Sequence, residues 1–247
     1  MKVIFHDDFY QVYTSDPAAE AGRMEAVTEA IKDRVEFVQA EPASEADLLA
    51  AHTPFHVESI KNRTLYHHAL LAAGGAIQAA TIGLVEPAFG LIRPPGHHAS
   101  SNSCWGFCYF NNMAIALERL KRTESIKTAY VLDIDLHYGD GTVNILGSKD
   151  WVVIHNVPSH DRRTYLEDVS REMEACEADM IAISAGFDNH EQDWGGTLKT
   201  EDYTEIGRLV REVADRNKGG SFAILEGGYN HRVLGHNVLA LIEGLSV

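Results

Sequence analysis

The sequence predicts an α/β fold in which a doubly wound parallel sheet carries helices on both faces. Two observations predict it. Short segments rich in β-branched residues alternate with longer segments of helical apolar spacing along all 247 residues. The short segments are apolar on both sides, as strands covered by helices on both faces are. No segment has the composition of a linker, so we expect one domain over residues 1–247.

The predicted strands and helices follow one another from end to end. The strands are expected at residues 2–5, 88–92, 128–134, 151–156, 179–184 and 221–226. The helices are expected at residues 20–33, 44–52, 65–84, 111–123, 165–176, 201–216 and 233–245. Ser44 stands three residues before Asp47, which predicts a capping box at the start of its helix. The helices supply the crossovers that parallel strands require.

The composition limits the classes of partner. The formal net charge is -15, from 21 Lys and Arg against 36 Asp and Glu. Nucleic-acid binding depends on clustered basic residues, so we expect no nucleic-acid partner. An acidic field attracts cationic substrates, although such a charge also simply keeps a protein in solution.

The cysteines and the apolar runs indicate where in the cell the protein is expected. Cys104 and Cys108 are separated by three residues and Cys176 stands alone, so they form neither a disulfide framework nor a zinc knuckle. The N-terminus has too short an apolar stretch for a signal peptide, and no apolar run is long enough to span a bilayer. The sequence therefore predicts a cytoplasmic protein with reduced thiols and no membrane contact.

Polar residues gather directly after four of the predicted strands. The four segments are RPPGHHA (93–99), DLHYGDG (135–141), AGFDNHEQD (185–193) and EGGYN (226–230). Ligands of such sheets bind outside the carboxyl ends of the strands. The sequence therefore predicts a site at this edge, built from His, Asp and Tyr side chains.

The segment VLDIDLHYGDG places Asp133, Asp135 and His137 at alternate positions. Alternate residues of an extended chain share a face, and acceptors side by side are costly without a cation among them. With Asp188 from another strand end, Asp135 and His137 match a catalytic zinc site that keeps positions open. Iron would accept the same ligands. If the motif stood alone, an Asp-rich turn capping the next helix would be the preferred interpretation.

The chain contains two tandem histidine pairs, of which one is expected in the site. His97 and His98 follow two prolines and a glycine, and two imidazoles beside a metal can divide the work of general base and general acid. His67 and His68 lie in an Ala-rich helical segment and are assigned to structure. Tyr229 follows two glycines and could stabilise an oxyanion, although glycines often mark only a turn.

Five motifs together resemble the zinc-dependent histone deacetylase and acetylpolyamine amidohydrolase superfamily. They are RPPGHHA, GFCYFNNMAIA, DIDLHYGDG, SAGFDNHEQD and LEGGYN, in the order and approximate spacing of that family. The resemblance runs from the first predicted strand to the last helix. It implies an arginase/deacetylase-like fold and hydrolysis of an N-acyl amide on an amine side chain or a polyamine.

The resemblance also implies the roles of the metal and of the reacting residues. One zinc ion per chain would be held by Asp135, His137 and Asp188. Tyr229 would polarise the acyl carbonyl. His98 would take the proton of the attacking water and His97 would assist electrostatically, although the residues alone leave open which histidine is the general base.

Supporting residues follow from the same resemblance. Asp133 would orient the first histidine of the pair and Asp140 the second. A potassium ion is implied near Asp133 and the backbone oxygens of Asp135 and His137. The substrate-binding residues that we expect are Phe107, Gly106 and Gly228.

The chain departs from the family where the substrate would enter. Only KNRT (61–64) separates the segment FHVESI (55–60) from the predicted helix that begins at residue 65, at a place where relatives have a longer rim loop, often with an acid that grips the substrate. Residues 155–165 lack the second tunnel aromatic, and Trp194 stands where DP is usual. No insertion of the kind that acetylpolyamine hydrolases use to dimerise is present. We therefore expect an open site, and the oligomeric state stays open.

The expected substrate is a cationic small molecule or peptide that carries an N-acyl group. Whether it is a protein, a polyamine or another amide is left open, as is the acyl length. One alternative is an esterase or a hydrolase of longer acyl chains, which the short rim suggests. Another is a metal-dependent binder of small ligands without turnover. His97, His98 and Tyr229 argue against the binder, since a binder needs no proton-transfer pair.

Overall fold

A computed structural model describes residues 1–247 and contains one seven-stranded sheet. The strands are β1 (Lys2–Phe5), β2 (Glu36–Gln39), β3 (Ala88–Gly90), β4 (Ala129–Asp133), β5 (Val152–Asn156), β6 (Met180–Ala185) and β7 (Gly220–Leu225). They lie in the order β2-β1-β3-β7-β6-β4-β5, and every neighbouring pair is parallel. The predicted parallel α/β fold is confirmed.

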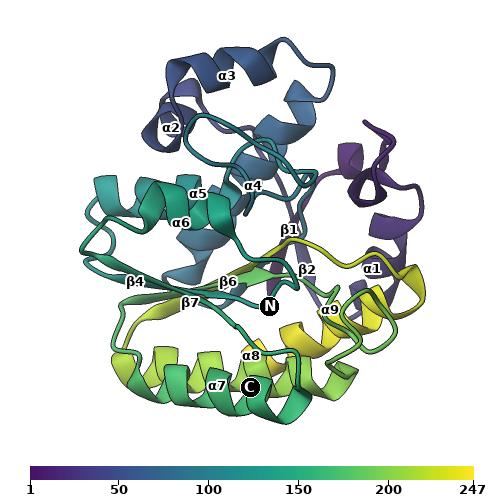
Figure 1. Cartoon of the computed structure of the whole chain (residues 1–247), viewed down its shortest axis with the longest axis vertical. Helices are drawn as coiled ribbons and strands as arrows, with labels where there is room; N and C mark the ends of the chain where they lie inside the picture. The colour runs from purple at the N-terminus through teal and green to yellow at the C-terminus, as the bar shows by residue number, and fades with distance from the viewer.

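Helices cover both faces of this sheet (Figure 1). They are α1 (Arg23–Ile31), α2 (Glu45–Ala51), α3 (Pro54–Lys61), α4 (Tyr66–Gly83), α5 (Asn112–Arg122), α6 (Asp140–Leu146), α7 (Arg162–Ala175), α8 (Thr200–Asn217) and α9 (His231–Leu245). Figure 1 shows α2 to α6 on one side of the strands, and α1, α7, α8 and α9 on the other. Two short 3-10 helices follow β1, at Asp7–Tyr10 and Pro17–Ala19.

The strand order brings the four polar segments together. Strands β3, β7, β6 and β4 are consecutive neighbours in the sheet, and each is followed by one of those segments. In the register, Asp133 pairs with Ser184 and Ala185 pairs with Leu225, so these strands end at nearly the same level. Because all strands are parallel, their carboxyl ends form one edge, where ligands bind in such sheets.

The hydrophobic core surrounds the middle of the sheet. Every residue of β3, β4, β6 and β7 is buried, because helices cover both faces there. One cluster of 69 buried apolar residues extends from Val3 to Leu245. The division into one domain over residues 1–247 rests on this cluster and stays a prediction.

Most elements lie within three residues of their predicted bounds, but one strand and two α-helices were not predicted, nor were the two short 3-10 helices. Strand β2 is an edge strand with mostly exposed side chains, so it lacks the apolar run that marks the buried strands. Helices α3 and α6 have only 8 and 7 residues, too few for a clear helical period. The capping box is confirmed, since the side chains of Ser44 and Asp47 each accept the backbone N–H of the other.

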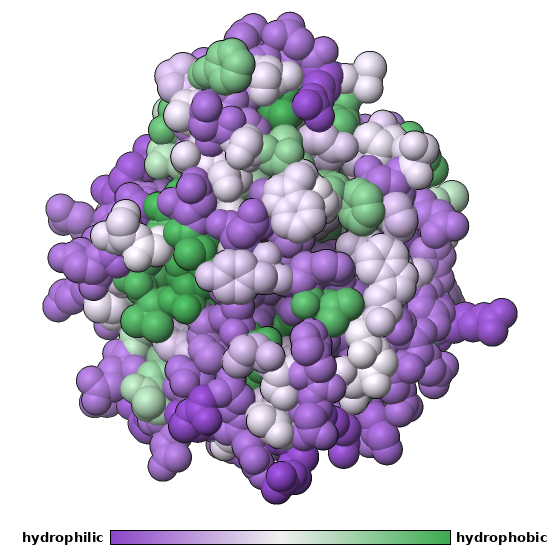
Figure 2. Space-filling view, in the orientation of Figure 1, coloured by the Kyte–Doolittle hydropathy of each residue, from purple (hydrophilic) through white to green (hydrophobic).

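The outer surface is predominantly hydrophilic, as Figure 2 shows. A larger apolar area lies at the left of that view, at the height of α5 and α6 in Figure 1. None of the helices has both the length and the apolar character that crossing a membrane demands.

Candidate metal centre and active site

Three side chains from two loops converge just outside the carboxyl ends of the strands. Asp135 and His137 follow β4, and Asp188 follows β6. His137 Nδ1 lies 3.1 Å from Asp135 Oδ1 and 3.0 Å from Asp188 Oδ2. The ligand atoms of all three residues lie within 4.8 Å of one another, which brings the predicted ligand set together.

The polar groups of this cluster fit a divalent cation. Both carboxylates are buried, and Asp188 Oδ2, which lies 3.0 Å from His137 Nδ1, has no other hydrogen-bond partner. Burial and the neighbouring Asp135 charge raise the pKa of Asp188 to about 7, because two carboxylates at this distance repel each other when no cation lies between them. Two carboxylates and one imidazole are a donor set that zinc accepts, with positions left for water and substrate.

The expectation that Asp133, Asp135 and His137 share one face of an extended strand is wrong in detail. Strand β4 ends at Asp133, and the chain then turns into a loop. In that loop Asp135 accepts the backbone N–H of His137, while Asp133 accepts the backbone N–H of Asp135. As a result Asp135 and His137 face Asp188, whereas Asp133 faces His97.

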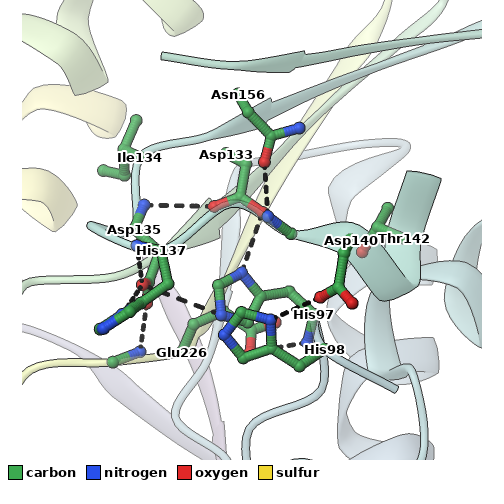
Figure 3. Close-up of polar contacts among 12 residues, drawn as sticks. His97, His98, Asp133, Ile134, Asp135, His137, Asp140, Thr142, Asn156 and Glu226 are labelled. Carbon is green, nitrogen blue, oxygen red and sulfur yellow. Dashed lines mark hydrogen bonds and ion pairs between the residues drawn. The ribbon is translucent and has the colours of Figure 1, made fainter. Parts of the chain in front are cut away.

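His97 is paired with Asp133 (Figure 3). Its Nδ1 lies 3.1 Å from Asp133 Oδ2 and its Nε2 lies 3.8 Å from Asp135 Oδ1. Burial disfavours the imidazolium, but the charges of Asp135 and Asp133 outweigh it and raise the pKa of His97 well above its ordinary value. These two carboxylates therefore favour the protonated ring of His97.

The pKa of His98 is shifted in the opposite direction to that of His97. Its Nδ1 lies 2.7 Å from Asp140 Oδ1, and the indole of Trp105 donates to Asp140 Oδ2 at 2.9 Å. Burial, followed by the neighbouring His97, lowers the pKa of His98 to about 4. With Nδ1 donating to Asp140, the Nε2 of this neutral ring is left as an acceptor. The pKa values of the two histidines, whose ring centroids are 4.0 Å apart, are thus shifted in opposite directions.

Tyr229 lies above the cluster, in the loop between β7 and α9. Gly228 before it has φ +113, a conformation that favours glycine. The backbone N–H groups of Tyr229 and Asn230 both donate to Asp193 Oδ2 at 2.8 Å. The tyrosine hydroxyl itself makes no hydrogen bond within the protein, so it is free to donate to a ligand.

A cavity of about 120 Å³ joins these groups. It is lined by Pro95, His97, His98, Trp105, Gly106, Phe107, His137, Trp194, Gly227 and Tyr229. Gly106 has φ +58, and a Cβ there would lie 2.4 Å from His98 Cδ2, so a larger residue would displace the histidine. The predicted substrate-binding residues Phe107 and Gly106 line the cavity, whereas Gly228 lies beneath Tyr229 and does not.

The family is decided by comparison of the whole chain. The model of the histone deacetylase domain matches residues 18–166 and 155–245. The chain belongs to the histone deacetylase domain family. The resemblance of the five motifs to this superfamily is thereby confirmed.

Relatives of this histone deacetylase family member include archaeal and bacterial proteins. A probable deacetylase of Methanothermobacter thermautotrophicus is 29% identical over 303 residues, covering 98% of this chain and 90% of that protein. A histone deacetylase-like amidohydrolase of Pseudomonas aeruginosa is 28% identical over 272 residues, covering 86% of this chain and 71% of that protein. The first alignment is longer than the 247 residues of this chain, so that relative carries segments that this chain lacks.

A solved structure confirms the fold of the family. The crystal structure of the HDA15 HD domain superimposes with a TM-score of 0.87 at 23% sequence identity. The superposition covers 99% of this chain and 88% of that domain. The arginase/deacetylase-like α/β architecture expected from the sequence is therefore the one observed.

Sequence reasoning missed Glu226, although it quoted the motif that contains it. Glu226 is fully buried, and its Oε2 accepts the backbone N–H groups of Gly96 and His97 at 2.7 and 3.2 Å. It therefore fixes the turn that presents the histidine pair. The available signal in the sequence was an acidic residue directly after an apolar strand, because such a residue is rarely buried unless it has partners.

Two further histidines, His52 and His56, support the loop that carries Phe107. His52 Nε2 accepts the backbone N–H of Asn111 at 2.9 Å, and its Nδ1 lies 3.0 Å from the Ser100 carbonyl. His56 Nε2 lies 2.8 Å from the Tyr109 carbonyl. Nothing in the local sequence indicates these partners, because they are more than 40 residues away.

The implied potassium site stays a prediction. Both oxygens of Asp133 are engaged, one by His97 and one by the Asp135 amide. The backbone carbonyls of Asp135 and His137 accept no hydrogen bond and remain available to a monovalent cation.

Proposed function

We propose that this protein is a zinc-dependent hydrolase that removes an acetyl group from an N-acetylated amine such as acetyl-lysine or an acetylpolyamine. One observation carries the proposal. His137 of the Asp135, His137 and Asp188 cluster, the carboxylate-paired histidines and Tyr229 all line one cavity. Family membership supports the same reaction class.

The metal would be held by Asp135, His137 and Asp188. A zinc ion bound there supplies Lewis-acid activation of water and of the acyl carbonyl. Gly227 donates its backbone N–H to Asp135 Oδ2 and Leu136 donates to Asp188 Oδ1, so the carboxylates are oriented before any ion binds. Since iron would accept the same donors, the metal has to be identified by analysis.

Proton transfer is assigned to His98. Its neutral Nε2 takes a proton from water as the water oxygen bonds to the carbonyl carbon. The same proton then passes to the amine nitrogen as the carbon–nitrogen bond breaks, which leaves a carboxylic acid and an amine. Asp140 keeps the ring in the required tautomer, and the protonated His97 stabilises the negative charge that develops nearby.

Tyr229 is assigned to the developing oxyanion. Burial, followed by the charges of Asp135 and Asp188, raises the pKa of its hydroxyl, so the group stays protonated and donates a hydrogen bond. Replacement of Tyr229 by Phe removes that donor alone. We expect the release of acetate from acetyl-lysine peptides and acetylpolyamines to slow by about 10²- to 10³-fold.

The matched control is Tyr66→Phe, which removes a hydroxyl from the N-terminal end of α4, outside the cavity. It should leave the rate unchanged, and metal analysis should give one ion per chain in both variants. A protein with stoichiometric metal that releases no acetate from either substrate would contradict the proposal. Faster turnover of longer acyl amides or of esters would favour that alternative, and binding without turnover would favour a binder.

A further inference from the structure

Two tryptophans stand at the mouth of the cavity, each stacked on a residue of the proposed chemistry. The ring of Trp105 lies 3.9 Å from that of His98 at an interplanar angle of 29°. The ring of Trp194 lies 4.0 Å from that of Tyr229 at 22°. The two indoles are 54% and 52% exposed, although both line the cavity.

Each indole is held in place. Trp105 donates its ring N–H to Asp140, and the loop of Trp194 is fastened to Tyr229 and Asn230 through Asp193. One face of each ring is covered by its stacking partner, so the exposed half of each indole is directed away from that partner. Aromatic rings that are fixed and half-exposed on a cavity wall are suited to binding a ligand and not to packing in the core.

The size of the cavity places these rings beside the amine end of a substrate. Its volume of about 120 Å³ corresponds to roughly four water-sized groups at ~30 Å³ each, enough for the four heavy atoms of an acetamide. His97 and His98 are buried in its depth, whereas the tryptophans are exposed. The chain on the amine nitrogen must therefore lead outward past Trp105 and Trp194.

The electrostatic surroundings of the mouth favour a positive charge. None of the ten residues that line the cavity is lysine or arginine, and the two cationic groups nearby, His97 and the Arg23 guanidinium 5.6 Å from the Tyr229 ring, are buried and not at the mouth. The Asp140 side chain, in contact with Trp105, is 42% exposed, and the chain as a whole has a formal charge of -15. The face of an indole attracts a cation within about 6 Å more strongly than other aromatic rings do.

We propose that Trp105 and Trp194 form a subsite for an ammonium group on the amine side of the substrate, a few carbons from the amide. The ligand class is a short N-acetylated diamine or polyamine. The proposal rests on the proposed function, since it names the substrate class of the same site. It assigns both tryptophans as specificity-determining residues.

The test uses two substrates that differ only at the end of the chain. N-Acetylputrescine ends in an ammonium group, whereas N-pentylacetamide has a methyl group in that place. The wild-type protein should favour the cationic amide in kcat/KM by about tenfold or more. Trp105→Leu and Trp194→Leu should each lower that preference about three- to tenfold, because leucine keeps an apolar wall but has no π face. The reacting amide is identical in both substrates, so changes at His98 or Tyr229 cancel in the ratio.

Trp105→Phe and Trp194→Phe are the matched controls. They keep an aromatic face and the net charge, so they should retain most of the preference. A wild-type protein that does not distinguish the two amides, or leucine variants that keep the full preference, would overturn the subsite.

A binding measurement separates this inference from the proposed function. Calorimetric titration of the same two amides into the Tyr229→Phe variant, with and without Trp194→Leu, needs no turnover. Tighter binding of N-acetylputrescine that is lost with Trp194→Leu would support the subsite even if no acetate is ever released. Equal binding of both amides in the presence of Trp194 would overturn it even if the protein proves to be an active deacetylase.

Discussion

Two aspartates two residues apart at the end of β4 have different environments. Asp135 lies in the cluster with His137 and Asp188, whereas Asp133 is bound to His97 and to the Asp135 amide. The first is a candidate metal ligand and the second orients a neighbouring ring. The difference arises because the chain turns after β4, so that the two carboxylates point in different directions.

Substitution can separate these two roles. Asp135→Ala should abolish stoichiometric metal binding, because it removes one of three donors. Asp133→Asn should keep the metal and lower the rate of deacetylation by about 10- to 100-fold, since it weakens the charge partner of His97. Metal analysis of dialysed protein and steady-state kinetics are the measurements. Equal loss of metal in both variants would show that Asp133 is itself required for the ion.

At the scale of elements, the short helices α2 and α3 support the loop that borders the cavity. His52, the C-cap of α2, accepts the N–H of Asn111, and Asn111 is the N-cap of α5. The Asn111 side chain in turn donates to the carbonyl of Ala99, next to the histidine pair. The end of one helix is thereby connected to the start of another and to the site.

This connection predicts a dependence of stability on pH. Burial, followed by the neighbouring His56, lowers the pKa of His52 in the folded state to about 3. The unfolded chain has the ordinary value of about 6.5, so protonation favours unfolding. The stabilisation is complete above about pH 6.5 and is lost as the pH falls toward 3. By pH 5 the loss should reach about 2 kcal/mol.

Urea unfolding at pH 7 and pH 5 measures this effect. The wild-type protein should lose about 2 kcal/mol more of its unfolding free energy over that interval than His52→Gln, which cannot titrate there. Equal losses in the two proteins would show that His52 does not carry the pH dependence.

At the scale of the whole molecule, the candidate metal centre joins loops that follow β4, β6 and β7. Asp135 accepts the N–H of Gly227, and Asp188 accepts the N–H of Leu136. Without a cation, the repulsion between the two buried carboxylates opposes this arrangement. An ion that binds only the folded state should therefore stabilise the entire chain.

The size of that stabilisation can be measured by thermal unfolding. Zinc at about 100 times its dissociation constant should add about 2.7 kcal/mol, which raises the Tm of a chain of this length by about 5 to 10 °C. A chelator should remove the increase, and Asp135→Ala should show none. A Tm that is insensitive to both zinc and chelator would argue against a metal bound at this cluster.

The sequence by itself determined most of the elements and the family. Buried strands and long helices were predictable, because a parallel sheet requires apolar runs on both faces and helices long enough to show a period. The motifs after β3, β4, β6 and β7 were predictable as a site, because parallel strands end at one edge. Strand β2 and helices α3 and α6 were not, since an exposed edge and two short helices leave little periodic signal.

Only the tertiary structure decided what the residues of the site touch. The bonds of Glu226 to the histidine turn and of Asp193 to the Tyr229 loop span 129 and 36 residues. The stacking of Trp105 on His98 and of Trp194 on Tyr229 depends on loop conformations set by such contacts. Spacing along a chain predicts which side chains share a local face, but contacts between loops form when the packed sheet brings its strand ends together.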